Sequence, residues 1–181
     1  MGGTISQLLS GGQSRGMRIF LTGLEGSGKT TFLKKMKQGQ PVAAIPELGF
    51  IEEGPFTVDL FDEPVIFTAW HAGGKSKDLP DWDNTSFQNP RAIIFLVDAN
   101  DPDRLPQARE ALRLLNAEEQ LRDIPLLVLA NKQDMPAAMS IAEVSNKLGD
   151  QGQRPWTLET ASLIDGEGMD DGFQWLSPMV R

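Results

Sequence analysis

The sequence contains no cysteine among its 181 residues. This absence excludes disulfides, thiolate metal sites and a cysteine nucleophile. It also excludes prenylation and palmitoylation, which both modify cysteine, so any lipid anchor has to lie at the N-terminus. Long apolar runs are missing as well, because the longest, residues 92–97 and 124–130, are far shorter than the roughly 20 residues that cross a bilayer. We therefore expect neither a transmembrane nor a secreted protein.

Positive charge is also scarce. The chain has 17 Lys and Arg against 25 Asp and Glu, a net charge of −8. This balance argues against nucleic acid as a partner, since a phosphate backbone attracts basic surfaces. Residues 1–24 nevertheless hold two arginines, Arg15 and Arg18, and no acidic residue. An acid-free end on an acidic body is suited to an anionic membrane surface, although two charges attract it only weakly.

Short apolar runs alternate with helical patterns along the chain. We predict strands over residues 17–22, 92–97, 125–129 and 156–159, with a hairpin over 55–59 and 65–70. We predict helices over residues 29–37, from Asp101 past Leu115, over 140–148 and over 169–179. The alternation predicts a doubly wound α/β domain over residues 17–181, preceded by an N-terminal segment over residues 1–16.

A glycine-rich loop lies between the first predicted strand and the first predicted helix. Residues 23–30 match the pattern G-x-x-x-x-G-K-[ST]. Glycines let consecutive backbone N–H groups point inward around a phosphate, and the N-terminus of the helix adds partial positive charge. Lys29 would neutralise phosphate oxygens and the Thr30 hydroxyl would ligate Mg²⁺. A chance glycine-rich turn is the alternative, which the flanking strand and helix disfavour. The predicted phosphate contacts are Gly23, Glu25, Gly26, Ser27, Gly28, Lys29, Thr30 and Thr31.

A second polar loop, with the sequence Asn-Lys-Gln-Asp, follows a buried apolar run and ends at Asp134. The Asp134 carboxylate can accept from both N1–H and the 2-amine of guanine, whereas adenine offers neither donor. A site built on such bonds rejects the analogue that lacks them. The Lys132 stem can lie over the purine and Asn131 can tie this loop to the phosphate loop. Ala161 or Ser162 can add a backbone N–H to guanine O6. The sequence thus predicts GTP or GDP as the ligand, with Mg²⁺.

These motifs together resemble the small GTPase superfamily and, within it, the Arf and Arf-like family. Besides the two loops, the resemblance rests on residues 45–50, 73–74, 87–89, 95–101, 121–123 and 175–176. It covers essentially the whole chain and implies a P-loop NTPase fold, with a mostly parallel six-stranded sheet flanked by helices. It also implies Gly74 as a further nucleotide contact, and effectors and regulators that bind through Phe50 and Trp70. The protein expected from the resemblance is a cytoplasmic monomer of vesicle trafficking, peripheral on endomembranes such as the Golgi.

The N-terminus extends this resemblance. Residues 1–6 fit the pattern M-G-x-x-x-[ST] for myristoylation on Gly2. Ile5, Leu8 and Leu9 fall on one helical face. One myristoyl chain binds a membrane only reversibly, so this face is needed as a second contact. A tail without a role is the alternative.

Three positions depart from the family pattern. Glu47 stands where switch I of the family supplies a Thr hydroxyl to Mg²⁺, and it either ligates the metal or holds switch I away from the γ-phosphate. His71 replaces the Asp behind the metal, either as a hydrogen-bonded strand-end residue or, when protonated, as a partial substitute for Mg²⁺. Lys75 replaces the Gln that orients the attacking water. Its ammonium has donors and no acceptor, so it cannot orient water as an amide does.

Because phosphoryl transfer depends on positioning that water, we expect a GTP-binding regulatory protein with very slow or absent hydrolysis, and we assign no catalytic residue. The alternative is a pseudo-GTPase scaffold, locked in one nucleotide state or free of nucleotide. A P-loop phosphotransferase is a third possibility, which the guanine loop disfavours. The hairpin between the switches is longer than in the family, and residues 47–63 hold six acidic residues and no Lys or Arg. We therefore expect a set of effectors that differs from that of ordinary Arf proteins.

Overall fold

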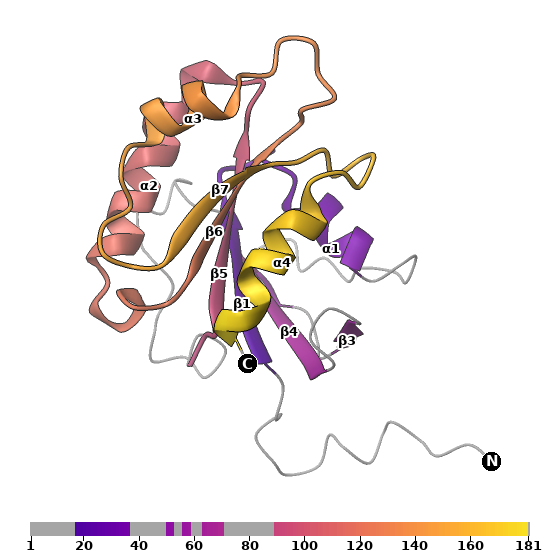
Figure 1. Ribbon diagram of the computed structural model, residues 1–181, viewed down its shortest axis with the longest axis vertical. Coiled ribbons are helices and arrows are strands. Elements are labelled where there is room, and N and C mark those ends of the chain that lie inside the picture. The colour runs from indigo at the N-terminus through magenta and orange to yellow at the C-terminus, as the bar shows by residue number, and fades with distance from the viewer. Residues whose placement is uncertain (1–16, 37–49, 53–55, 59–62, 71–88, 181) are drawn as a thin grey trace, which may run out of the picture.

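The apolar runs of the sequence form the strands of one sheet with helices on both faces (Figure 1). The computed structural model describes residues 17–36, 50–52, 56–58, 63–70 and 89–180. The strands are β1 (Met17–Gly23), β2 (Phe50–Glu52), β3 (Phe56–Val58), β4 (Glu63–Trp70), β5 (Ala92–Asp98), β6 (Leu126–Asn131) and β7 (Trp156–Thr160). The helices are α1 (Lys29–Met36), α2 (Leu105–Ala117), α3 (Ile141–Leu148) and α4 (Met169–Val180), with short 3-10 turns η3 (Pro102–Arg104) and η4 (Glu119–Leu121).

The sheet has the order β2-β4-β1-β5-β6-β7, and β3 also pairs with β4. Parallel pairing joins β4, β1, β5, β6 and β7, whereas β2 and β3 run antiparallel to β4. The predicted parallel sheet and the hairpin are therefore confirmed. In the described ranges the sheet has seven strands, because the outer arm of the predicted hairpin consists of two segments, β2 and β3. Phe50 at the start of β2 pairs with Trp70 at the end of β4.

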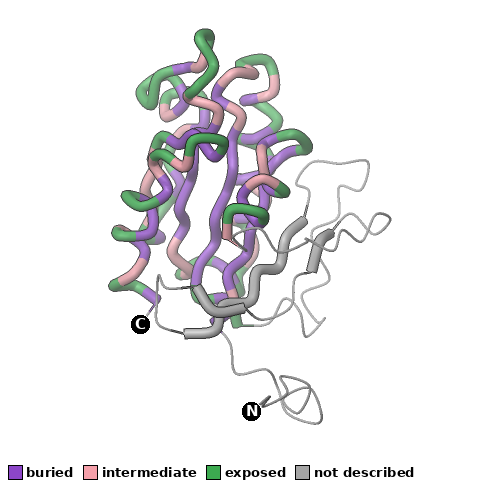
Figure 2. Tube along the Cα trace, turned by 90° about the vertical axis from the view of Figure 1, so that its right-hand side faces the viewer, coloured by how far each residue is buried: buried purple, intermediate pink, exposed green. Residues whose placement is uncertain are grey.

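The core consists of two apolar clusters, one on each face of the sheet. Successive side chains of a strand point to opposite faces. Ile19 of β1 accordingly packs in the cluster under α1 and α4, whereas Phe20 packs in the cluster under α2 and α3. On the first face, the rings of Phe32 and Phe173 join α1 to α4 with centroids 6.0 Å apart. Figure 2 shows buried strands in the middle of the described part and exposed residues along the outer sides of the helices. Burial on both faces is the usual state of a parallel sheet.

The helix boundaries follow from local chemistry. Ser140 caps α3, where its hydroxyl accepts from the Glu143 N–H at 3.3 Å and its own N–H donates to Glu143 Oε2 at 2.8 Å. These bonds from Ser140 hold the pKa of the Glu143 carboxyl below its usual value. The helix predicted from Asp101 begins later, at Leu105, because Pro102 opens a 3-10 turn first.

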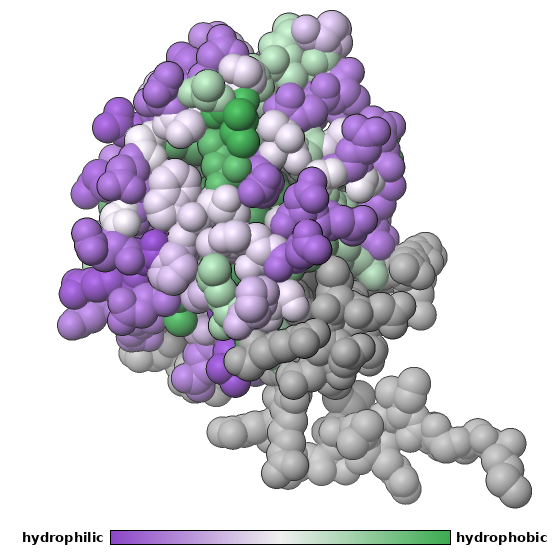
Figure 3. Space-filling view, in the orientation of Figure 1, coloured by the Kyte–Doolittle hydropathy of each residue, from purple (hydrophilic) through white to green (hydrophobic). Residues whose placement is uncertain are grey.

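The face drawn in Figure 3 is mostly hydrophilic, with a small apolar patch between α3 and β7. In the part of the chain that the structure describes, no helix is long and apolar enough to cross a bilayer.

Candidate nucleotide-binding site

Four loops meet at the carboxyl edge of the parallel sheet. They follow β1, β5, β6 and β7, and this edge is where doubly wound sheets bind ligands. A cavity of about 460 Å³ opens between them. Its lining residues are Gly26, Gly28, Lys29, Thr30, Thr31, Asn100, Asn131, Lys132, Asp134, Met135, Leu163 and Ile164. Most of the predicted nucleotide contacts thus line one cavity.

The phosphate loop takes a backbone path that only glycine allows at two points. Gly23 has φ +141°, and a Cβ there would lie 2.3 Å from the carbonyl oxygen of Leu96 in β5. Gly28 has φ +111°, and a Cβ there would lie 2.4 Å from Nδ2 of Asn131. Both positions therefore need glycine for conformation and for space. The second contact also shows that the phosphate loop and the base loop touch.

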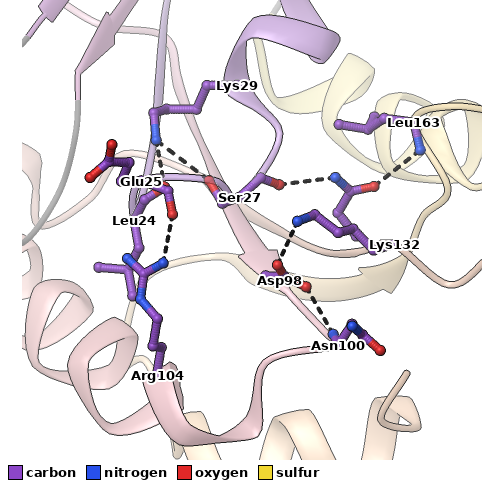
Figure 4. Close-up of polar contacts among 10 residues, drawn as sticks. Leu24, Glu25, Ser27, Lys29, Asp98, Asn100, Arg104, Lys132 and Leu163 are labelled. Atoms are coloured by element: carbon purple, nitrogen blue, oxygen red, sulfur yellow. Dashed lines mark hydrogen bonds and ion pairs between the residues drawn. The ribbon is translucent and has the colours of Figure 1, made fainter. Parts of the chain in front are cut away.

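Lys29 is buried within the phosphate loop, with 4% of its surface exposed. Its Nζ donates to the carbonyl oxygen of Gly23 at 2.7 Å. It also donates to the carbonyl oxygen of Leu24 at 2.7 Å and lies 3.5 Å from Ser27 Oγ (Figure 4). The pKa of Lys29 is lowered to about 7, chiefly by burial; the nearby Glu25 opposes this shift and Arg104 adds to it. An anion beside this nitrogen would restore the charged form, so a buried amine of this kind fits a phosphate group.

Arg104 approaches the same loop from the start of α2. Its Nη1 donates to the carbonyl oxygen of Glu25 at 2.9 Å, as Figure 4 shows. Nothing in the sequence predicts this contact, because no motif links Arg104 to a loop 79 positions earlier. The contact adds a second cation beside the phosphate loop.

Asn131 joins the base loop to two other segments. It is buried, and its Nδ2 donates to the Ser27 carbonyl oxygen at 2.9 Å. Its Oδ1 accepts from the N–H of Leu163 at 3.0 Å. The predicted link between the base loop and the phosphate loop is present, and it extends to the loop after β7. One amide side chain thus holds three walls of the cavity together.

Lys132 extends across the cavity toward the end of β5. Its backbone has φ +69°, the left-handed region that few residues other than glycine adopt. Its Nζ forms an ion pair with Asp98 Oδ2 at 2.6 Å, and Asp98 Oδ1 accepts from the N–H of Asn100 at 2.9 Å. Figure 4 shows this chain of contacts. The geometry keeps the Lys132 stem extended, as packing over a purine requires. Asp98 was not predicted, and its one signal in the sequence is an acidic residue that ends a buried run.

The loop after β7 carries the backbone amides of Ala161 and Ser162. The N–H of Ala161 donates to the Ala130 carbonyl at 2.9 Å, and the N–H of Ser162 donates to the Glu167 carbonyl at 3.0 Å. The two amides expected at guanine O6 therefore have partners within the chain. Ser162 reaches the site through its hydroxyl instead, with Oγ 3.2 Å from Asp134 Oδ1.

The metal side of the site is only partly within the described ranges. Thr30 lies at the N-terminus of α1 and lines the cavity, where its hydroxyl suits Mg²⁺. In residues 17–36 and the other described segments, no group of three Asp, Glu or His side chains could hold a metal ion. A divalent ion at this site would be held by Thr30, by phosphate oxygens of a bound nucleotide and by residues outside the described ranges. The predicted residues that lie outside the described ranges are Gly2, Ile5, Leu8, Leu9, Glu47, His71, Gly74 and Lys75.

A phosphate loop and an Asn-Lys-x-Asp loop on one edge of this sheet define a P-loop protein of the small-GTPase class. The family model of the ADP-ribosylation factor (Arf) family matches residues 4–180. The chain belongs to this family and is a GTP-binding regulatory small GTPase. Proteins of the family bind GTP or GDP with Mg²⁺, act through effectors and regulators, and associate peripherally with membranes.

Proposed function

We propose that this chain is a trafficking GTPase that binds GTP and GDP and hydrolyses GTP very slowly or not at all without a partner. The observation that carries the proposal is a contrast within the site. Residues expected to bind phosphate and base, among them Lys29, Asn131 and Asp134, line one cavity. The family's residues for the γ-phosphate and its metal are replaced at positions 47, 71 and 75.

The two sets of residues would also serve different parts of the chemistry, namely nucleotide binding and GTP hydrolysis. The phosphate loop and Lys29 would neutralise charge on the phosphates, and Thr30 would hold Mg²⁺, which bridges and polarises phosphate oxygens when bound. Orientation of the attacking water needs an acceptor, and Lys75 offers none. We therefore expect an unassisted rate well below the about 10⁻⁴ s⁻¹ of small GTPases that carry the glutamine.

Single-turnover hydrolysis of GTP by the full chain tests this proposal. The variant Lys75→Gln, alone and with Glu47→Thr, restores the family's side chains and should raise the rate at least about tenfold. Lys77→Gln removes a neighbouring charge in the same stretch and should leave the rate unchanged. A wild-type rate equal to that of ordinary Arf proteins would contradict the proposal.

Membrane attachment is proposed through a myristoyl group on Gly2 and the apolar side chains Ile5, Leu8 and Leu9. Sequence pattern supports it, since these positions share a helical face behind a myristoylation motif. The myristoylated chain should co-sediment with anionic vesicles, and Gly2→Ala should remove most of that binding. Equal binding by Gly2→Ala would exclude the lipid anchor. Sorting to the Golgi or to other endomembranes rests on family membership alone.

A pseudo-GTPase scaffold is the second candidate, since the same three substitutions would also suit a protein that never turns over nucleotide. Partners of either protein would bind the surface around Phe50 and Trp70, and the chain would act as a monomer. The nucleotide content of purified protein distinguishes the two. A switch protein releases GDP or GTP on denaturation and exchanges it in a Mg²⁺-dependent way, whereas a scaffold releases none or exchanges none.

A further inference from the structure

The Ser162 hydroxyl lies between two carboxylates. Ser162 is 2% exposed, and its Oγ is 2.8 Å from Asp165 Oδ2 and 3.2 Å from Asp134 Oδ1. The N–H of Asp165 also points at this oxygen, at 3.4 Å. Asp134 is the residue that the base motif assigns to guanine, whereas no motif includes Asp165.

The hydroxyl has one proton, and a carboxylate can only accept it. A serine between two carboxylates therefore donates to one of them at a time. The shorter distance directs the proton to Asp165. Among the residues that the structure describes, Ser162 is the donor that lies beside the Asp134 carboxylate, and its proton is then not available to fix the rotation of that carboxylate. A second negative charge also stands close by, within about 6 Å, because both carboxylates reach the same oxygen.

We propose that Asp165 is a positioning residue that sets how strictly the site selects guanine, because it takes the Ser162 proton that would otherwise hold Asp134 in place. This inference rests on the proposed binding of guanine nucleotides. It adds that selection in this chain is looser than the Asn-Lys-x-Asp loop alone would give.

The contribution of the guanine 2-amine to the binding affinity measures this effect. Asp134 would accept one hydrogen bond from N1–H and one from the 2-amine, so both oxygens have to be aligned at once. Inosine nucleotides keep N1–H and lack the 2-amine. A carboxylate that turns freely gains little from the second bond, and the affinities for GDP and IDP then lie close together. A carboxylate held in one orientation gains from the second bond, so the affinity for GDP then exceeds the affinity for IDP.

The variant Asp165→Asn tests the inference, because the amide can donate to Ser162 Oγ and leave the hydroxyl proton to Asp134. We expect a GDP affinity about three- to tenfold higher, and a GDP-to-IDP affinity ratio larger by a similar factor. Asp165→Ala removes the competing acceptor and should change both quantities in the same direction. Both are measured by competition against a fluorescent guanine nucleotide, with melting temperatures to show that each variant is folded.

Glu167→Gln is the matched control. Glu167 lies in the same loop, is exposed, and contacts Ser162 through backbone atoms. Its neutralisation removes one negative charge and leaves the Ser162 hydroxyl untouched. A gain in Glu167→Gln equal to that in Asp165→Asn would reduce the effect to general charge and overturn the inference.

A second substitution closes the test. Ser162→Ala combined with Asp165→Asn should abolish the gain that Asp165→Asn gives by itself, because the hydroxyl proton that passes to Asp134 is then absent. A large loss in Ser162→Ala alone would show that the hydroxyl already serves Asp134 and would overturn the inference. Binding of GDP by the wild type with no gain in Asp165→Asn refutes the inference alone. Absence of GDP binding in the wild type and in every variant refutes the proposed function with it.

Discussion

The phosphate loop and the base loop line one cavity, yet different parts of the chain hold them. The phosphate loop depends on backbone groups: Lys29 donates to two main-chain carbonyls, Arg104 donates to a third, and Gly23 passes a carbonyl of β5. The base loop depends on its own side chains, since Asn131 bonds to the Ser27 carbonyl and the Leu163 N–H and Lys132 pairs with Asp98. Phosphate binding should therefore tolerate most side-chain replacements, whereas base selection should change with single ones.

The largest effect is expected where the phosphate loop does depend on a side chain. Lys29→Met removes the cation that is buried within the phosphate loop and should weaken GDP and GTP binding at least about 100-fold. Lys34→Met, on the exposed side of the same helix, should leave the affinity unchanged. Calorimetry with nucleotide-stripped protein measures both variants. Retained affinity in Lys29→Met would mean that backbone amides alone bind the phosphates.

Asn131 connects the phosphate loop to the base loop, so its replacement should affect both. Asn131→Ala leaves the buried Ser27 carbonyl and the Leu163 N–H without this partner, which should lower the free energy of unfolding by about 2 to 4 kcal/mol. Nucleotide affinity should fall about tenfold or more, for GDP and IDP alike. Denaturant unfolding measures the free energy of unfolding, and nucleotide titration measures the affinity. A loss confined to GDP would show that the base loop moves independently of the phosphate loop.

The pH dependence of binding separates the regions without a change of fold. Lys29 has a pKa of about 7 in the protein, and a bound phosphate would raise it. Binding then takes up a proton above pH 7, so the affinity for GDP should fall as pH rises, by up to about tenfold per pH unit. Below the pKa the amine is already charged and the affinity should level off. Lys29→Met should remove the slope between pH 6 and 8.5, and Lys34→Met should keep it. An unchanged slope in Lys29→Met would show that a group other than Lys29 takes up the proton on binding.

The smallest effect is expected at the edge of the base loop. Asp98→Asn removes the charge that holds Lys132 extended, in an ion pair that is partly exposed and therefore weak. We expect a loss of affinity of about two- to fivefold for GDP, and no change for inorganic pyrophosphate, which contacts the phosphate loop alone. Competition binding with both ligands measures the difference. A parallel loss for pyrophosphate would show that Asp98 acts on the whole cavity.

The sequence predicts the elements of this fold well because most of them are local. Apolar runs fix the buried strands, and Ser140 with Glu143 fixes the start of α3. Both loops of the site are also contiguous motifs, so they can be read without a structure. The division of the hairpin arm into β2 and β3 has no such pattern.

The features that were missed depend on contacts between distant segments. Arg104 and Asp98 contact residues 79 and 34 positions away, and nothing near them in the chain predicts these partners. Asp165 contacts Ser162 within one turn, where no motif marks it. The partners of the Ala161 and Ser162 N–H groups could not be predicted for a related reason, since they follow from strand register and from the turn at Glu167.

The most direct test is a calorimetric titration of nucleotide-stripped, folded protein with GDP and, separately, with ADP. We predict binding of GDP with a dissociation constant of about 1 μM or tighter, and no heat from ADP at the same concentrations. Folded protein that takes up neither GDP nor GTP, or takes up ADP equally well, would contradict the account.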